Sequence, residues 1–231
     1  MAADISVRRH IRWIPAPASE PTSTIVLTSP GRRFVDIRIR VAPGPEMGQL
    51  DWAFAGTSSS EPGPEPRVRR AVWKHWVDSS TPHAETVRDE AEVREAEDDA
   101  GTELETGRMV NPATGVEADY EEAWVSAEVL VTGSQSEGRP VTAVVQTCDD
   151  ERQVRGMVVR VGQFCQGILR VGEAVTVERW EWRLESGWTL SKKFGEEELP
   201  VEALLRDAER LVVGGIIENG GRVWRILEAE K

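Results

Sequence analysis

The only tyrosine of the chain, Tyr120, lies within an acidic run, Asp119-Tyr120-Glu121-Glu122. Carboxyl groups whose pKa is shifted by their surroundings can exchange protons with a substrate, and a neighbouring tyrosine can orient them. The run follows the turn-forming residues of Asn111-Pro-Ala-Thr-Gly115, so we expect it near the exposed end of a hairpin. The alternative is a carboxylate with a perturbed pKa at the mouth of a pocket.

Tryptophan is unusually frequent, with nine tryptophans beside four phenylalanines and one tyrosine. Most of these rings are expected in a packed core, but inward aromatic rings of a small barrel can also line an apolar pocket. The pairs Trp52/Phe54 and Trp180/Trp182 are the best pocket candidates, since two-residue spacing places each pair on one strand face. The full set of ligand-pocket candidates is Trp52, Phe54, Trp73, Trp76, Tyr120, Arg160, Trp180 and Trp182.

Two pairs of arginines, Arg38/Arg40 and Arg155/Arg160, alternate with apolar residues along predicted strands. Such pairs are more typical of solvated strand faces than of clamps for a ligand carboxylate, and we expect solvated faces here. Arg160 is kept among the pocket candidates because an arginine within a barrel could hold a polar group of a ligand.

Metal and nucleophile chemistry has weak support in the sequence. A metal site would have to combine His75, Asp78 and His83, which we expect instead to be ordinary strand or surface residues. Cys165 has no nearby histidine or helix start, so we expect a buried structural thiol, and with Cys148 as the only other cysteine a reducing compartment. No nucleotide-binding, serine-hydrolase or zinc-enzyme motif occurs, and no cofactor or metal is predicted.

The elements that would position these residues are mostly strands, because apolar and polar residues alternate along much of the chain. One example places Val35, Ile37 and Ile39 on one face and Asp36 and Arg38 on the other. Helical spacing occurs between Pro200 and Val212, where one helix is expected. The remaining strand candidates are Ser23–Leu27, Leu50–Gly56, Val68–Val77, Val141–Thr147, Val154–Val161, Phe164–Val171, Glu178–Leu184 and Gly187–Phe194, with hairpins at Met109–Trp124 and Gly215–Ile226.

Charge is concentrated in one segment of the chain. The range 85–105 holds ten acidic residues and two arginines, a net charge of −8, against −12 for the whole chain. We expect an exposed loop at about 84–107, or alternatively a docking site for a basic partner, and a second loop at Ser58–Pro66. The acidic balance disfavours nucleic acid and anionic membranes as partners.

A weak internal repeat suggests two similar β units. Ile25–Thr28 followed by Phe34–Arg40 resembles Val144–Thr147 followed by Val154–Arg160. We therefore predict an N-terminal barrel over residues 1–127 and a C-terminal barrel over residues 128–231, because antiparallel sheets of this size commonly close to remove their edges. The charged N-terminus and the lack of a long apolar run predict a soluble, cytoplasmic protein.

Several longer stretches of the sequence form recognisable motifs. They are Ser23-Thr-Ile-Val-Leu-Thr-Ser-Pro30, Arg33-Phe-Val-Asp-Ile-Arg38, Leu50-Asp-Trp-Ala-Phe-Ala-Gly-Thr57, Gly107-Arg-Met-Val-Asn-Pro-Ala-Thr-Gly115, Asp119-Tyr-Glu-Glu122, Arg155-Gly-Met-Val-Val-Arg160, Gly162-Gln-Phe-Cys-Gln-Gly167 and Glu178-Arg-Trp-Glu-Trp182. Together these stretches resemble the fungal HRI family, which is named for interaction with a casein kinase I homologue. The resemblance implies two lipocalin-like barrels in an all-β fold, a cytoplasmic and nuclear location and a kinase partner, and it supplies no catalytic residues.

The leading functional prediction is a non-catalytic binding protein for a protein partner or a small apolar molecule. The alternative is a cofactor-independent cyclase or isomerase of fungal natural-product biosynthesis, which would act through cavity shape and a few hydrogen bonds. An enzyme predicts a cavity of several hundred Å³ with a buried Arg, Asp or Tyr facing Trp walls. An interaction protein predicts barrels filled by their own side chains.

Overall fold

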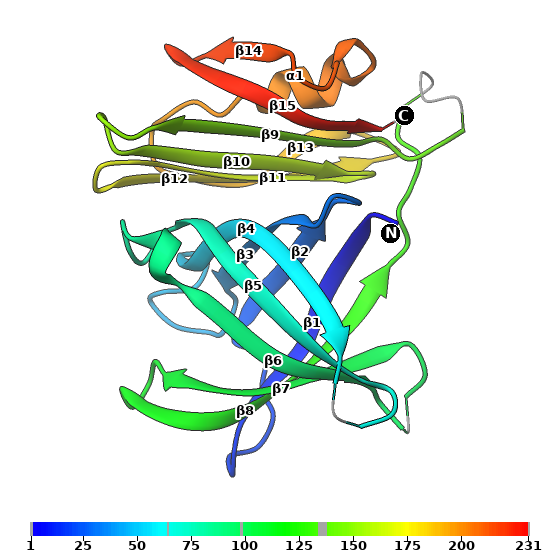
Figure 1. Cartoon of the computed structure of the whole chain (residues 1–231), viewed down its shortest axis with the longest axis vertical. Helices are drawn as coiled ribbons and strands as arrows, with labels where there is room; N and C mark the ends of the chain where they lie inside the picture. The colour runs from blue at the N-terminus through cyan, green and yellow to red at the C-terminus, as the bar shows by residue number, and fades with distance from the viewer. Residues whose placement is uncertain (1, 64, 98, 134–137, 231) are drawn as a thin grey trace.

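The computed structural model describes residues 2–63, 65–97, 99–133 and 138–230, so Pro64 and Asp98 of the two expected loops lie outside the described residues. Within these ranges the first eight strands form a closed antiparallel barrel, in which β1 also pairs with β8 (Figure 1). The barrel strands are β1 (Asp4–Trp13), β2 (Thr22–Thr28), β3 (Arg33–Arg40), β4 (Leu50–Pro62), β5 (Val68–Asp78), β6 (Arg88–Glu95), β7 (Thr102–Asn111) and β8 (Val116–Ala127).

A second antiparallel sheet follows, and it corrects the prediction of two barrels. In the described part of the chain it has seven strands in the order β13-β12-β11-β10-β9-β15-β14 and does not close. The two edges of this sheet are protected from pairing with other chains without closure into a barrel, because β14 is only four residues long and β13 carries Lys192 and Lys193. The strands are β9 (Thr142–Asp149), β10 (Val154–Val161), β11 (Phe164–Val171), β12 (Ala174–Arg183), β13 (Gly187–Phe194), β14 (Ile216–Asn219) and β15 (Arg222–Glu230).

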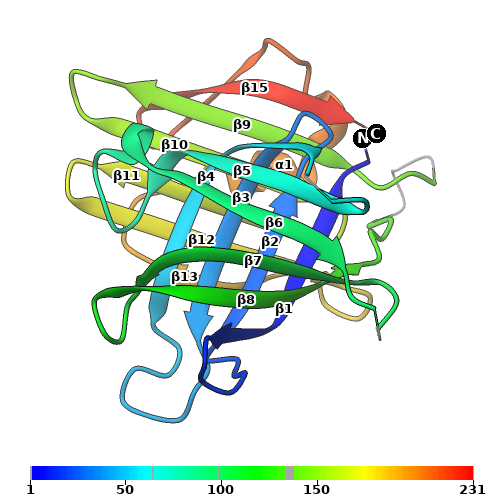
Figure 2. The same ribbon diagram turned by 60° about the horizontal axis from the view of Figure 1, so that its bottom comes forward.

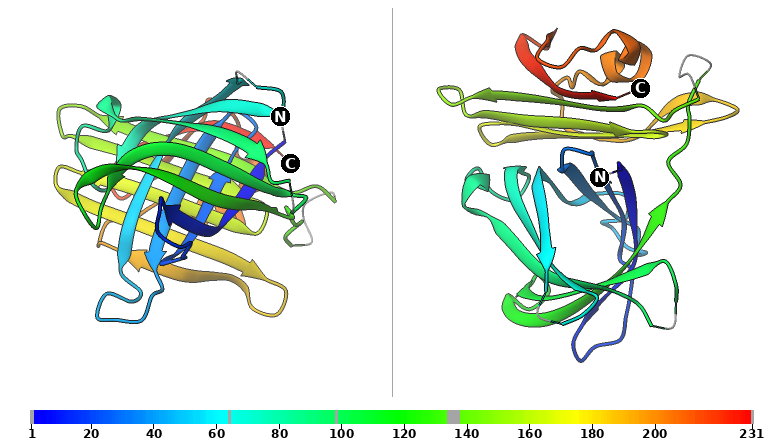
Figure 3. Two further views of the ribbon diagram at one scale, coloured as in Figure 1. Left: turned by 90° about the horizontal axis from the view of Figure 1, so that it is seen from below. Right: turned by 45° about the vertical axis from the view of Figure 1, so that its right-hand side comes forward.

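The open sheet is covered on both faces. One face packs against the outside of the barrel wall, where Ile25, Val35 and Ile37 meet Met157 and Val159 in one buried cluster. Strands β2, β3 and β4 cross the sheet at a steep angle in this layer (Figure 2). The other face is covered by the chain around α1 (Val201–Arg206), while β6, β7 and β8 form the barrel wall farthest from the sheet (Figures 1 and 3).

Polar side chains also join the barrel to the sheet. Gln166, with no exposed surface, donates hydrogen bonds from Nε2 to the carbonyls of Ile25 and Val35 at 2.9 and 3.1 Å. Arg179 donates from Nη2 to the carbonyl of Ile37 at 2.7 Å and from Nε to Gln166 Oε1 at 2.8 Å. The two layers are thus held in a fixed relation by directional contacts as well as by apolar packing.

Three local predictions are wrong in their extent. Most of the acidic range 84–107, expected as a loop, forms β6 and β7 of the barrel wall, where two inward positions, Ala91 and Val93, are apolar and buried. Strand β4 likewise runs to Pro62, through most of the expected Ser58–Pro66 loop. The helix ends at Arg206 and continues only as a 3₁₀ turn, Ala208–Arg210. Among the described residues, no helix is both long and apolar enough to cross a membrane.

Candidate functional site

The barrel encloses a cavity of about 490 Å³. Its lining combines aromatic rings with charged side chains, and half of the predicted pocket candidates, Trp52, Phe54, Trp73 and Tyr120, belong to it. The cavity is also lined by Phe34, Asp36, Arg38, Asp89, Glu105, Glu122 and Trp124.

Strand register explains why these side chains point inward. Residues directly opposite one another on paired strands share a face of the sheet. Arg38 of β3 lies opposite Trp52 of β4, and Asp36 lies opposite Phe54 in the same pairing. The polar face of β3 is therefore the inside of the barrel, and its apolar face packs against the second sheet. The expectation that Arg38 lies on a solvated face is wrong.

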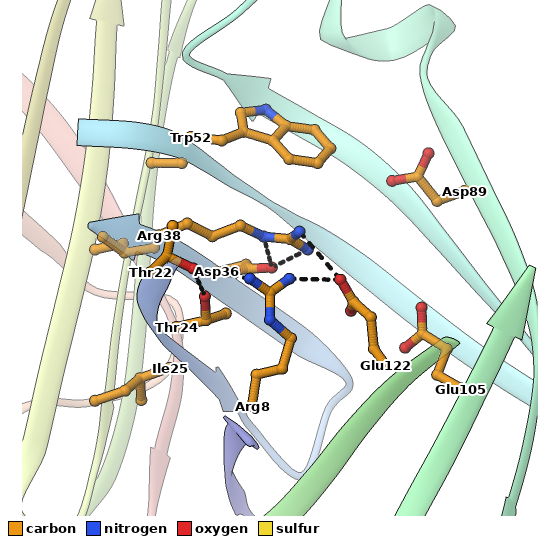
Figure 4. A network of polar contacts seen from close by, with 12 residues as sticks. Arg8, Thr22, Thr24, Ile25, Asp36, Arg38, Trp52, Asp89, Glu105 and Glu122 are labelled. Atoms are coloured by element: carbon orange, nitrogen blue, oxygen red, sulfur yellow. Dashed lines mark hydrogen bonds and ion pairs between the residues drawn. The ribbon is translucent and has the colours of Figure 1, made fainter. Parts of the chain in front are cut away.

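Two arginines and one glutamate form the centre of the polar interior (Figure 4). Arg38 donates to Asp36 Oδ2 at 2.9 Å and to Glu122 Oε1 at 3.5 Å, and Arg8 donates to the same Glu122 oxygen and to Glu20. Burial lowers the pKa of the Arg38 guanidinium, but Asp36 and Glu122 outweigh burial and the net shift is upward. Both cations are therefore firmly held in the charged state.

Tyr120 and Glu105 form a second polar pair on β8 and β7. The Tyr120 hydroxyl donates to Glu105 Oε1 at 2.9 Å. Burial, followed by the negative charge of Glu122, raises the pKa of Glu105 to about 8, and burial likewise raises the pKa of Tyr120. Glu105 thus carries a proton at neutral pH. Tyr120 and Glu122 are both buried, so the expectation of an exposed hairpin end is wrong for these two residues. The carboxyl group with the perturbed pKa is Glu105, which lies outside the predicted acidic run.

His75, Asp78 and Asp89 form a third polar group beside the cavity wall. The Nδ1 of His75 lies 2.8 Å from Asp78 Oδ2 and its Nε2 lies 3.1 Å from Asp89 Oδ2. Burial lowers the pKa of His75, but the hydrogen bonds with Asp78 and Asp89 prevail and raise it to about 8. Asp78 also accepts a hydrogen bond from Trp52 Nε1 at 2.9 Å, which fixes the orientation of the indole. The His75 ring stacks on Phe54 with a centroid distance of 4.3 Å.

The other four pocket candidates lie outside the cavity. Trp76 packs between the barrel and the sheet, with the Arg155 guanidinium 4.9 Å from its ring centroid. Trp180 packs in the cluster around α1, and Trp182 lies opposite Trp188 at the β12–β13 edge. Arg160 is buried, which contradicts a solvated face, but it donates to Thr132 Oγ1 at 2.7 Å and to the carbonyl of Leu204. It caps the helix region and does not reach the barrel interior.

The candidate metal and thiol residues have structural roles. His83 is exposed and does not join His75 and Asp78, and no group of three or more His, Cys, Asp or Glu side chains in the described ranges is arranged to hold a metal ion. Cys165 is buried as predicted, and burial raises its thiol pKa to about 12. Such a thiol is not a nucleophile at neutral pH.

Sequence reasoning missed several polar residues of the interior, among them Arg8, His75 in this role, Asp89 and Glu105. Arg8 lies opposite Trp124 on paired strands, and Asp89 lies opposite Trp73. The available signal was the position of each polar residue opposite an aromatic residue, but reading it requires the strand register. Asp89 and Glu105 were hidden within the acidic range that we expected to be a loop.

Comparison with known proteins places the chain in a family. The family model described as Protein HRI1 matches residues 4–228, which is nearly the whole chain. The chain belongs to the HRI1 family. This confirms the resemblance inferred from the sequence motifs.

A solved structure agrees with this membership of the HRI1 family. The crystal structure of the uncharacterized protein YLR301w from Saccharomyces cerevisiae is similar over 100% of both chains, with a TM-score of 0.79 and 18% sequence identity. At this identity the likeness shows a shared fold. No curated protein matches the chain.

Proposed function

We propose that this HRI1-family protein binds a small molecule inside its N-terminal barrel. The observation that carries the proposal is the cavity of about 490 Å³, which falls within the range of about 300–1,000 Å³ typical of small-molecule sites. Its walls supply both apolar contact from Trp52, Trp73 and Trp124 and hydrogen-bonding groups from Glu105 and Tyr120. The ligand is therefore more polar than the purely apolar molecule expected from the sequence.

Fixed side chains support a binding site rather than a loosely filled core. Trp52 is held by Asp78, Arg38 by Asp36, and Tyr120 by Glu105. A preorganised lining loses little conformational freedom when a ligand enters, which favours affinity. The protein partner expected from the family resemblance stays a prediction, and it does not require the cavity.

A cavity-filling variant tests the proposal. The neutral dye N-phenyl-1-naphthylamine, whose fluorescence rises in apolar surroundings, is titrated into the wild type and into Ala71→Phe. Ala71 lines the cavity, so the larger side chain is expected to weaken binding about tenfold or more by occupying the site. The control is Val72→Phe, because the neighbouring residue of β5 faces the opposite side of the strand. Saturable binding that both variants retain would contradict the proposal.

Catalysis is the second candidate, supported by the Tyr120–Glu105 pair. A carboxylic acid that keeps its proton at neutral pH can donate that proton to a bound molecule, and the cavity places Arg38, Asp36 and Tyr120 opposite Trp walls. This is the arrangement that an acid-catalysed cyclisation or isomerisation without a cofactor would need. Once a ligand is identified, its conversion by the wild type and loss of conversion in Glu105→Gln would support catalysis.

A further inference from the structure

Two buried cations of the barrel interior, Arg8 and Arg38, already have carboxylate partners. Arg8 donates to Glu20 at 3.0 and 3.1 Å and to Glu122, and Arg38 donates to Asp36 and Glu122. An anionic ligand would have to displace these buried partners, at the cost of leaving a carboxylate unpaired. These two arginines therefore complete the cavity wall instead of offering a site for an anion. Four further arginines line the cavity, of which Arg69, Arg88 and Arg108 pair with carboxylates and Arg32 has no carboxylate partner among the described residues.

Two carboxyl groups of the cavity, in contrast, are not fully paired. Glu105 accepts a hydrogen bond from Tyr120, and no ion pair to it occurs in the described ranges of the chain. Asp36, a cavity-lining residue that is 2% exposed, has a second carboxylate oxygen, Oδ1, without a hydrogen-bond partner among the described residues. This oxygen is buried, so a ligand would not contact it, but it adds negative potential beside the cavity.

Aromatic rings of the same cavity already accommodate cations. The Arg38 guanidinium lies 5.0 Å from the Trp52 centroid and 5.6 Å from the Phe54 centroid, and the Arg8 guanidinium lies 6.0 Å from the Trp124 centroid. These distances are those of cation–π contacts. Asp89 and Glu105 lie on the opposite side of the cavity from Arg38 and Trp52 in Figure 4. A ligand between them would meet carboxyl groups on one side and aromatic rings on the other.

We propose that the barrel cavity is selective for an organic cation, an ammonium group on an apolar body. The ammonium would donate hydrogen bonds to Glu105, which releases its proton to solvent when the cation binds, with Asp36 adding negative potential, and the apolar body would pack on Trp52 and Trp73. This inference rests on the proposed function, because it names the chemical class of the molecule that the cavity binds.

Three compounds with one skeleton and different charge test the inference. 2-Phenylethylamine, 2-phenylethanol and 3-phenylpropionate are titrated separately at pH 7.5, with intrinsic tryptophan fluorescence as the readout. We expect the amine to bind about tenfold more tightly than the alcohol, since hydrogen bonds to a charged group add this much, and the carboxylate to bind most weakly.

Variants assign the selectivity to one residue. Glu105→Gln keeps the shape of the side chain and is expected to reduce the preference for the amine to about twofold or less, because the ionisable carboxyl is gone. The matched control is Glu92→Gln on the neighbouring strand β6, whose side chain is exposed and does not line the cavity; it should keep the full preference.

The outcomes separate the two proposals. Equal binding of all three compounds, or tighter binding of the carboxylate, would overturn the selectivity for cations and leave small-molecule binding intact. Selectivity that survives in Glu105→Gln would overturn the assignment to this residue. Binding of neither these compounds nor the neutral dye would overturn both proposals.

Discussion

Arg38 is the residue around which the polar interior is organised. It lies on β3, whose outer face is buried against the second sheet, and it stays charged because Asp36 and Glu122 compensate the loss of water. Its side chain also covers the rings of Trp52 and Phe54. One residue therefore fixes both the charge balance and the aromatic wall of the cavity.

His75 should make stability depend on pH. Its pKa in the folded protein, about 8, lies above the ordinary value of 6.5. Its contribution to the free energy of unfolding is therefore fully present below pH 6.5 and is lost as the pH rises through 8. Relative to His75→Asn, the wild type should lose about 2 kcal/mol of unfolding free energy between pH 6 and pH 9. Urea unfolding of both proteins at the two pH values measures this difference. Parallel pH dependence of both proteins would contradict the assigned pairing with Asp78 and Asp89.

Glu105 should also make stability fall as the pH rises, because folding disfavours its ionised form. Its pKa rises from 4.5 to about 8 on folding, so the unfolded state loses this proton first and the wild type is destabilised progressively between these pH values. At pH 9 Glu105→Gln should be more stable than the wild type by roughly 1–3 kcal/mol, a reduced figure because the side chain reaches the water of the cavity. At pH 4 this advantage should disappear. A glutamine variant less stable than the wild type at pH 9 would show that Glu105 is not held protonated.

Residue alternation predicted where the strands lie along the chain more reliably than it predicted which face of each strand meets water. Val154–Val161, Phe164–Val171 and Gly187–Phe194 are strands with the predicted bounds. Alternation on β3 also separated Asp36 and Arg38 correctly from their apolar neighbours. It could not tell which face meets water, because the apolar face packs against another layer and the polar face lines an interior. The same ambiguity hid the inward position of Glu122.

The contact between β12 and the barrel gives a prediction at this scale. Arg179 is 2% exposed and donates to the carbonyls of Ser23 and Ile37, and its pKa is lowered by burial to about 10, which still leaves it charged at pH 7. Arg179→Met should reduce the unfolding free energy by about 3 kcal/mol, because buried carbonyls lose their donor. Arg183→Met on the same strand is the control, since Arg183 is exposed and should change stability by less than about 0.5 kcal/mol. Equal effects of both changes in urea unfolding would argue against the polar link between the layers.

The whole molecule combines one closed barrel with one open sheet. The sequence repeat correctly pointed to two successive sets of antiparallel strands, such as the hairpins β2–β3 and β9–β10. Alternation could not predict whether the second set of strands closes into a barrel, because closure depends on what covers the two faces and the edges of the sheet. Here the barrel wall covers one face and the segment around α1 covers the other. The cavity consequently belongs to the first set of strands alone.

The central claim, that the barrel cavity binds a small molecule, is tested most directly by NMR of the tryptophan indoles. Each of the nine tryptophans gives one indole N–H resonance, which single Trp→Phe variants assign. On addition of 2-phenylethylamine or the neutral dye, the resonances of Trp52, Trp73 and Trp124 should shift saturably, because these rings line the cavity. Trp180, Trp182 and Trp188 lie on the second sheet and should not respond. Shifts confined to the second sheet, or no indole shift with either compound, would contradict binding in the barrel.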